Sequence, residues 1–355
     1  MSKLRIGIIF GGISSEYEVS LQSAASVIDN IPCEDYEVVM LGITKRGRWL
    51  YYPGDTELIR KDEWAQHPDC ISAVISPDRM HKGIIKLQED GSSALLKLDC
   101  VFPVMHGAYG GEDGSIQGLL NLAGIPYVGC NLLSSAICLD KSITHTMLDY
   151  AKIPNASWIC LTKNDLANLD NICAKAEKRF GYPVFVKPAN TGSSVGINKA
   201  KNAEELTNAV KIAFTHDEKV IIEQYIQGLE VEAAVLGTAD NCIVAQPGHI
   251  IPANEFYDYD AKYHADSITK IPAGISDEIK ETIINTAKDV YKLFNCKGLS
   301  RIDFFVTSEN NIIVNEINTI PGFTSISMYA KMFEYSGISY SELLTRLIEL
   351  AIKVD

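Results

Sequence analysis

Two neighbouring segments near the C-terminal end constrain the fold of this chain most. Side chains alternate in polarity over residues 300–306, residues 312–317 are rich in β-branched residues, and a polar stretch at 307–311 separates them. These patterns predict two paired strands joined by a turn. Pairing would place Asp303 on one strand and Glu316 and Asn318 on a single face of the other. Two carboxylates and an amide oxygen are ligands that Mg²⁺ or Mn²⁺ prefers, so the hairpin predicts a metal site.

Arg301 lies two residues from Asp303 and is expected on the same face, as a cation beside the metal site. The alternative is an ordinary edge hairpin whose charged face meets water, since half-exposed sheets commonly alternate in this way. Spacing alone leaves both interpretations open.

Composition limits the class of protein. A length of 355 residues allows two or three domains with proper cores, and a net charge of −13 argues against a nucleic-acid or anionic-membrane partner. Nine cysteines without CxxC spacing are typical of reduced thiols in a cytoplasm. The first residues run straight into a strand and no apolar run reaches membrane-spanning length, so we expect neither a signal peptide nor a membrane segment.

The first residues predict an α/β unit. Residues 4–10 form a short apolar run typical of a buried parallel strand, followed by two glycines and then a helix through about Ile28. Ser15 and Glu18 have the spacing of a capping box at the start of this helix. Glu16 has two interpretations: an acid favoured by the helix dipole, or a carboxylate that binds a substrate ammonium.

A second strand, at 101–105, also ends in a glycine-rich loop, and His106 is its first polar residue. A histidine after a strand is often structural, but the glycines that follow permit close approach of a ligand. Helices are expected over 115–123 and over 132–151, the second carrying Lys141.

The middle of the chain carries candidate nucleotide-binding residues. A buried strand ends on Lys187, and the loop 190–196 is rich in glycine and hydroxyl residues that suit phosphate oxygens, although an ordinary hairpin has the same composition. It lacks the GxxxxGK[ST] pattern of a P-loop. Glu223 and Glu230 bracket a turn between strands and suit a nucleotide base and ribose, or alternatively face solvent. The aromatic-rich segment 255–263 is expected to be a loop that covers a site.

Together these features resemble an ATP-grasp enzyme, and over essentially its whole length the chain resembles the D-alanine–D-alanine ligase family. Five motifs in order carry the resemblance: residues 10–20, 106–114, 187–196, 256–263 and 318–325. The implied fold class is α/β, an ATP-grasp fold with an N-terminal parallel-sheet domain. The implied domains are 1–130 for the first D-alanine, 131–222 as the central ATP-grasp lobe, and 223–355 as the C-terminal lobe with the metal site and the lid.

The resemblance implies a reaction in which one D-alanine carboxylate attacks the γ-phosphate of ATP, giving an acyl phosphate and ADP. The amine of a second D-amino acid then attacks the carbonyl and phosphate leaves. By motif match Glu16 would hold the first ammonium, and His106 would lie near the first carboxylate. The residues implied to bind ATP are Lys141, Lys187, Ser194, Glu223, Glu230 and Lys262.

Further roles follow from the same motifs. Ser193 and Tyr263 would join Glu16 in a hydrogen-bonded set that links the phosphate loop to the lid. Arg301 and the Gly322 N–H would stabilise the tetrahedral oxyanion. The residues implied to bind two Mg²⁺ or Mn²⁺ ions are Asp303, Glu316 and Asn318.

The acceptor is the open question. Tyr263 is expected where the acceptor is an amine, and Ser327 and Met328 would line its pocket, with Ser327 receiving the carboxylate. Ile326 stands where many relatives carry histidine, and the loop after His106 is one residue longer than the common form. Residues 42–45, 128–136 and 318–325 look most like the VanG-type ligases of vancomycin resistance, which favours D-serine, with D-alanine as the alternative. Such relatives are commonly dimers.

Two other classes compete with this interpretation. One is an ATP-grasp ligase for a different carboxylate and amine, against which the Glu16 and His106 motifs argue. The other is a non-catalytic nucleotide-binding protein, which would be expected to have lost some of the metal ligands, the lysines or Arg301.

Overall fold

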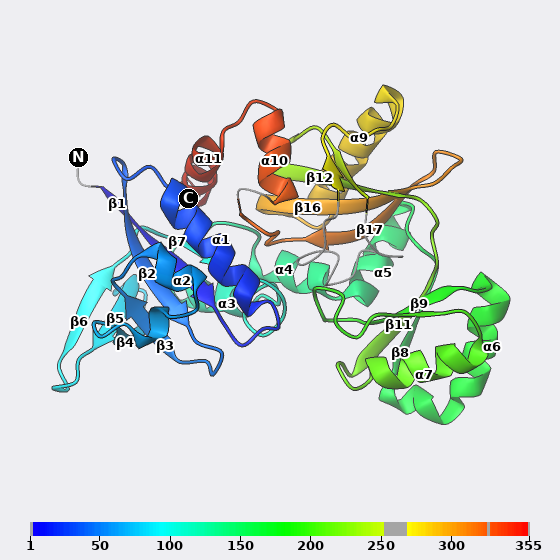
Figure 1. Ribbon diagram of the computed structural model, residues 1–355, viewed down its shortest axis with the longest axis horizontal. Coiled ribbons are helices and arrows are strands. Elements are labelled where there is room, and N and C mark those ends of the chain that lie inside the picture. The colour runs from blue at the N-terminus through cyan, green and yellow to red at the C-terminus, as the bar shows by residue number, and fades with distance from the viewer. Residues whose placement is uncertain (1–2, 252–267, 325–326, 354–355) are drawn as a thin grey trace.

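Three β-sheets organise the protein, and they meet around α4 and α5 (Figure 1). The computed structural model describes residues 3–251, 268–324 and 327–353. We call the three parts the N-terminal, central and C-terminal units, after the seven-stranded, four-stranded and six-stranded sheets that they contain. Within the described ranges, no helix has both the length and the apolar character needed to cross a bilayer.

The N-terminal unit contains a mixed sheet with strand order β6-β5-β4-β3-β2-β1-β7. Only β2, β1 and β7 are parallel, so the expectation of a parallel sheet holds for three strands. The remaining strands pair antiparallel, as in the hairpin of β2 and β3, which residues 44–48 connect. The elements are β1 (Leu4–Gly11), α1 (Tyr17–Asn30), β2 (Tyr36–Ile43), β3 (Trp49–Tyr52), α2 (Thr56–Arg60), β4 (Ile71–Ile75), β5 (Gly83–Leu87), β6 (Ser93–Lys97), β7 (Cys100–Val104) and α3 (Ser115–Ala123).

Helix α1 begins without the predicted capping box. Its N-cap is Glu16, which makes no side-chain capping bond. Glu18 is drawn away from the helix end by Lys45, whose Nζ donates to Glu18 Oε1 at 2.7 Å. The start of the helix is instead fixed by Ser20, whose Oγ accepts from Gly11 N at 2.8 Å.

The segment that connects the N-terminal and central units contains an isolated bridge between Tyr127 and Val101. The helix expected over 132–151 is two helices, α4 (Leu132–Leu139) and α5 (Lys141–Ala151). They are separated at Asp140, whose extended backbone and side-chain bonds to Ser142 N and Ile143 N cap the second helix.

The central unit is an antiparallel sheet of order β10-β9-β11-β8 covered by α6 and α7. Its elements are β8 (Trp158–Thr162), α6 (Leu169–Phe180), β9 (Val184–Pro188), β10 (Asn198–Ala200), α7 (Ala203–Ala213) and β11 (Lys219–Gln224). Its apolar side chains form a core of their own.

The C-terminal unit is built on the order β15-β14-β12-β16-β17, with β13 paired to β12. Its elements are β12 (Leu229–Thr238), β13 (Cys242–Val244), β14 (Gly248–Ile251), β15 (Ile268–Lys270), α9 (Asp277–Leu293), β16 (Lys297–Val306), β17 (Ile312–Asn318), α10 (Met328–Tyr335) and α11 (Tyr340–Ile352). The predicted hairpin is present as β16 and β17.

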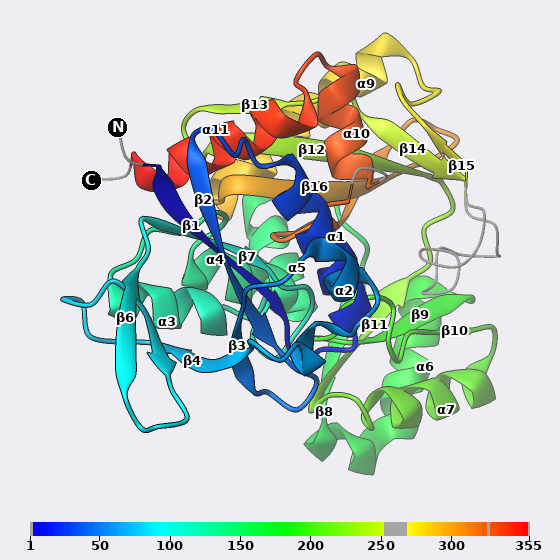
Figure 2. The same cartoon turned by 60° about the vertical axis from the view of Figure 1, so that its left-hand side comes forward.

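Helices α10 and α11 join the C-terminal unit to the N-terminal one (Figure 2). One hydrophobic core includes Phe10 and Leu21 of the N-terminal unit together with Phe323, Met332 and Leu347 of the C-terminal unit. These two units therefore share a core, whereas the central unit has its own.

Candidate active site

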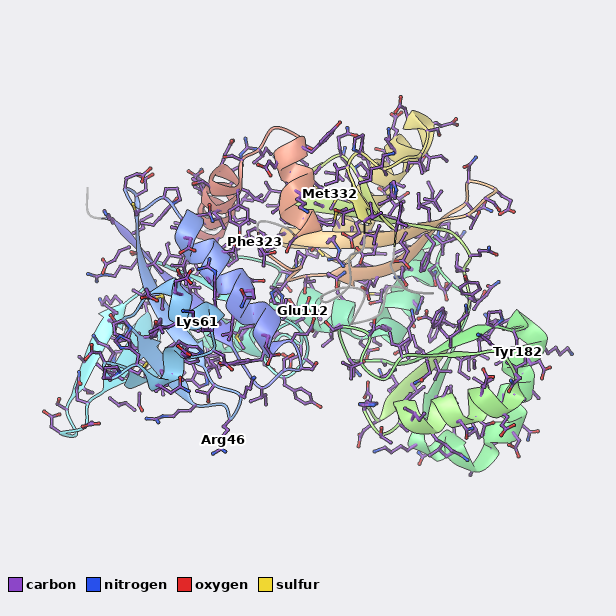
Figure 3. All side chains as sticks on the ribbon, in the orientation of Figure 1. Arg46, Lys61, Glu112, Tyr182, Phe323 and Met332 are labelled. Atoms are coloured by element: carbon purple, nitrogen blue, oxygen red, sulfur yellow. The ribbon has the colours of Figure 1, made fainter. Side chains whose placement is uncertain are left out.

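A cavity of about 330 Å³ lies where the three units meet. That volume lies within the range of small-molecule sites. Glu112, labelled in Figure 3, lies at this junction and lines the cavity. The cavity also brings together most of the residues predicted from sequence: Glu16, Lys141, Lys187, Ser193, Ser194, Glu223, Glu230, Arg301, Asp303, Glu316 and Asn318. Lys262 and Tyr263 lie outside the described residues.

Glu16 faces the cavity from the N-terminus of α1 and is 6% exposed. Its Oε1 accepts a hydrogen bond from Ser193 Oγ, which joins α1 to the loop of the central unit as expected from sequence. Its Oε2 is buried and has no hydrogen-bond partner among the described residues. Two glycines leave room beside this oxygen: a Cβ on Gly107 would overlap it, and one on Gly192 would lie 2.6 Å away. The space suits a donor from a ligand.

The loop 190–196, which the sequence suggests for phosphate, has an unusual backbone. Ser193 and Ser194 both have positive φ, at 47° and 58°, a conformation uncommon outside glycine. Successive left-handed and turn conformations point backbone N–H groups towards one side, as anion-binding loops do. Lys141 reaches the same loop, with its Nζ donating to Thr191 O at 2.7 Å. Burial lowers the pKa of Lys141, and the negative charge of Glu316 offsets part of this decrease.

Lys187 and Glu223 form a buried ion pair at 2.5 Å on neighbouring strands β9 and β11. Glu223 also accepts from His145 Nε2 at 2.9 Å. Burial alone would raise the pKa of Glu223, but the charge of Lys187 and the hydrogen bond from His145 outweigh it and lower the pKa to about 2. In this structure Glu223 is therefore an ionised partner of two basic groups at the edge of the cavity.

The hairpin of β16 and β17 carries the acidic face predicted from sequence. Asp303 lies opposite Glu316 and Arg301 lies opposite Asn318, with an irregularity in the pairing after Asp303. Asn318 Nδ2 donates to Asp303 Oδ2 at 3.1 Å. The register places Glu232 of β12 on the other side of Asp303, so three carboxylates form a row across three strands.

Arg301 offsets part of the negative charge of this row and is 7% exposed. Its Nε and Nη2 donate to Asp303 at 2.7 and 2.6 Å, and Nε lies 3.3 Å from Glu232. Burial would lower its pKa, but the two carboxylates raise it well above its ordinary value. The site therefore holds a rigid cation beside the proposed metal ligands.

The donor set on this hairpin suits a divalent cation. Asp303, Glu316 and Asn318 offer carboxylate and amide oxygens, which are hard ligands for Mg²⁺ or Mn²⁺. Over the described part of the chain, no group of three or more His, Cys, Asp or Glu side chains has the arrangement of a metal centre. A metal would therefore rely on Asn318 and on ligand oxygens to complete its shell, in competition with Arg301 for Asp303.

His106 does not line the cavity; it connects units. It is 3% exposed, with Nδ1 2.8 Å from Ile320 O and Nε2 3.0 Å from Ser23 Oγ. Glu112, which sequence reasoning did not assign, holds the same segment through Ile320 N at 3.1 Å and the His106 loop through Gly107 N at 2.9 Å. Both residues fix the chain that leads to Gly322.

Ser327 and Met328, predicted to line the acceptor pocket, lie close to Gly322 in the structure and in the shared core, respectively. Ser327 Oγ bonds to Thr324 N at 3.0 Å and Thr324 Oγ1 at 2.8 Å. A Cβ on Gly322 would lie 3.3 Å from the same hydroxyl, so the two residues are close. Met328 is 7% exposed and packs in the shared core.

Three residues of this site carried a signal that sequence reasoning did not use. Glu112 belongs to the glycine-rich motif after His106, Glu232 lies two residues from Glu230 on one strand, and His145 lies four residues from Lys141 on one helix face. Glu112 thus lies inside a motif already assigned to the site, and the spacing of Glu232 and His145 puts each of them on a face already assigned to it.

A cavity enclosed by a glycine-rich loop, lysines and an acidic hairpin from separate α+β units is the architecture of the ATP-grasp fold. Solved structures of this type match the chain closely. One is VanG D-Ala:D-Ser ligase from Enterococcus faecalis, with a TM-score of 0.90, 40% identity and coverage of 99% of this chain and 100% of that one. Another is the D-alanine–D-alanine ligase from Coxiella burnetii, with a TM-score of 0.86, 37% identity and coverage of 99% and 95%.

Sequence comparison gives the family. Family models described as D-ala D-ala ligase N-terminus and D-ala D-ala ligase C-terminus match residues 5–130 and 147–349. A D-alanine–D-alanine ligase of Caldicellulosiruptor bescii is 48% identical, covering 99% of this chain and 96% of the relative. D-alanine–D-alanine ligase A of Escherichia coli K12 is 44% identical, covering 99% and 97%. The chain belongs to the D-alanine–D-alanine ligase family.

Proposed function

We propose that the protein is an ATP-dependent ligase that joins D-alanine to a second D-amino acid for peptidoglycan precursor synthesis. One observation carries the proposal. A single cavity combines a Glu16 carboxylate oxygen that has no partner among the described residues, two lysines beside a glycine-serine loop, and an acidic hairpin with Arg301. These groups suit an ammonium, a polyphosphate and a divalent cation respectively.

The first step would place the D-alanine ammonium against Glu16 Oε2, in the space beside Gly107 and Gly192. Its carboxylate oxygen attacks the γ-phosphorus of ATP, the bond to the bridging oxygen breaks, and ADP leaves with an acyl phosphate formed. Lys141 and Lys187 neutralise phosphate oxygens and hold them in line. A divalent cation held by the hairpin would supply charge neutralisation at the phosphates.

The second step would form the peptide bond. The acceptor amine, after losing a proton from its ammonium form, attacks the acyl carbonyl to give a tetrahedral oxyanion. Arg301 is held rigid by Asp303 and Glu232 and would stabilise this charge together with the Gly322 N–H. Phosphate leaves as the carbonyl reforms.

The remaining assignments are proposals of the same kind. They are base or ribose contacts at Glu223 and Glu230, a place near the first carboxylate for His106, phosphate contacts at Ser194 and Lys262, a role for Tyr263 beside Ser193, and acceptor contacts at Ser327 and Met328. We also propose boundaries at 130 and 222 between domains, with β11 continuing to Gln224. Reduced thiols support a cytoplasmic location, since all nine cysteines are free. A homodimer is proposed from the family resemblance.

We propose D-alanine as the acceptor, supported by the relatives of 44% to 48% identity that bear the name D-alanine–D-alanine ligase. D-serine is the second candidate, favoured by the sequence resemblance and supported by the TM-score of 0.90 to VanG D-Ala:D-Ser ligase. The D-serine preference expected from sequence is thus placed second.

The test is release of ADP from ATP and Mg²⁺, first with D-alanine alone and then with D-alanine and D-serine, with products separated by mass. We expect D-alanine-dependent ADP and a D-alanyl-D-alanine product in both reactions. A mixed dipeptide dominating the second reaction would assign D-serine as the acceptor. Absence of D-alanine-dependent ADP in either reaction would refute the ligase assignment.

A further inference from the structure

A line of five polar side chains runs from the surface of α5 to the cavity: Asp149, Asn155, His145, Glu223 and Lys187. Consecutive members are joined at 2.9 Å (Asp149 to Asn155), 2.8 Å (Asn155 to His145), 2.9 Å (His145 to Glu223) and 2.5 Å (Glu223 to Lys187). The function proposed above uses Lys187 and Glu223 of this set and gives the other three residues no role. His145 is 2% exposed and lies at the centre of the line.

The orientation of the Asn155 amide is fixed by its neighbours. Its Nδ2 donates to Asp149 Oδ1 at 2.9 Å and to Ile153 O at 3.1 Å, and both of these atoms are acceptors. Trp158 Nε1 donates to the other oxygen of Asp149 at 3.0 Å, which holds that carboxylate in place. If the amide were flipped, its oxygen would face two other acceptors, Asp149 Oδ1 and Ile153 O. Asn155 Oδ1 therefore faces His145 Nδ1, and that ring nitrogen must donate.

The other ring nitrogen must also donate. His145 Nε2 is 2.9 Å from Glu223 Oε1, and Glu223 Oε2 pairs with Lys187 Nζ at 2.5 Å, so Glu223 is an ionised carboxylate that can only accept. A histidine with both nitrogens donating is an imidazolium. The line then alternates in charge along its ionisable members, from Asp149 through His145 and Glu223 to Lys187.

The surroundings of the ring agree with a buried cation. Glu223 of β11 faces it from the cavity side, with Lys187 of β9 beyond, and Asp149 of its own helix lies beyond Asn155. The indole of Trp158 on β8 stacks on the ring, with centroids 5.5 Å apart and planes at 18°, which suits a cation over an aromatic face. A positive charge also comes from the same helix: Lys141 lies one turn before His145 on α5 and lines the cavity.

We propose that His145 is a positioning residue that works as an imidazolium and frees Lys187 for the nucleotide phosphates. Lys187 cannot serve phosphate oxygens fully while it is the only counter-charge of a buried carboxylate, because an unpaired buried charge is costly. With His145 protonated, Glu223 keeps one cation when Lys187 turns to the phosphates. The inference rests on the proposed use of ATP, but the protonation state of His145 does not.

The first test is a nitrogen-15 NMR spectrum of the histidine rings in the whole protein without nucleotide, near neutral pH. Both nitrogens of His145 should report attached protons. His249 is an internal reference, because its Nδ1 accepts from Gly274 N at 3.0 Å and must be unprotonated. A His145 ring with one unprotonated nitrogen, like that of His249, would overturn the proposal even if every variant failed to fold.

The second test is kinetic. His145→Gln should raise the KM for ATP by about 10- to 100-fold, the scale of one charge-assisted hydrogen bond, with a smaller change in the KM for D-alanine. His145→Lys restores a cation and should recover most of the affinity. His67→Gln, on a histidine outside the cavity, is the matched control and should leave both constants unchanged.

Comparison of the two variants separates charge from packing. His145→Gln can still form hydrogen bonds but carries no charge, so the KM for ATP should be higher in His145→Gln than in His145→Lys. Equal KM values for ATP in the two variants, or an unchanged KM in His145→Gln, would overturn the proposal. A wild type without ATP-dependent activity would refute the ligase assignment instead, with the NMR test still deciding the state of His145.

Discussion

Arg301→Ala removes the cation that lies between two buried carboxylates. Arg301 is 7% exposed, bonds to Asp303 through two nitrogens at 2.7 and 2.6 Å, and lies 3.3 Å from Glu232. Removing one partner from a buried ion pair costs about 3–5 kcal/mol, because the remaining charge stays buried without compensation. The free energy of unfolding of a typical protein is about 5–15 kcal/mol, so the variant should fold but melt at a clearly lower temperature. Its turnover should fall by about two to three decades.

Mg²⁺ provides the decisive comparison for this variant. If Asp303, Glu316 and Asn318 bind the ion, Mg²⁺ should restore part of the stability that Arg301→Ala loses and raise its melting temperature more than that of the wild type. The assay is thermal unfolding with and without Mg²⁺. Arg346→Ala is the matched control, since Arg346 forms a half-exposed pair with Glu342 at 2.6 Å and should cost less than about 1 kcal/mol. Equal losses in the two variants, or equal Mg²⁺ shifts in Arg301→Ala and wild type, would refute the reasoning.

Two more predictions concern the N-terminal side of the cavity. Burial, and then the charge of Glu16, raise the pKa of Glu112 from 4.5 to about 7. Between these two pH values the folded protein holds a proton on Glu112 that the unfolded chain has lost. The free energy of unfolding should therefore fall as pH rises from 4.5 to about 7. Glu112→Gln does not titrate, so its free energy of unfolding should gain up to about 3 kcal/mol relative to wild type between pH 4.5 and 8. Urea unfolding at several pH values measures this, and a difference between the two proteins that stays constant with pH would contradict the prediction. Gly107→Ala should raise the KM for D-alanine at least tenfold, because its Cβ would overlap Glu16 Oε2 at a φ of 74°. Gly91→Ala, with a φ of 83° and open space around it, should show only the backbone cost and an unchanged KM.

Features set by local patterns were predictable from the sequence. The hairpin of β16 and β17 brings Asp303 opposite Glu316 because strand periodicity fixes which side chains share a face. Helix ends were harder to predict. The break at Asp140 depends on its carboxylate, which caps α5 and also accepts from Lys219 Nζ of β11. The supposed capping box failed for a similar reason, since Lys45 captures Glu18 from outside the helix.

Roles that depend on distant partners could not be predicted. The place of His106 beside a substrate stays a prediction from its motif, whereas its bonds to Ser23 and to Ile320, which is 214 residues away, have no sequence signal. Glu112 and His145 take their roles from Ile320 and Glu223 in the same way. Sequence periodicity places a side chain on a face of its own element, but it does not say which other element that face meets.

The separate core of the central unit has a consequence for the timing of the reaction. The N-terminal and C-terminal units cannot part without exposing the apolar side chains that Phe10 shares with Phe323 and Leu347. The central unit keeps its apolar side chains within its own core, so a swing of this unit relative to the other two would leave that core intact. Entry of fresh nucleotide and departure of spent nucleotide would then depend on this swing, and the overall turnover rate on how often it opens.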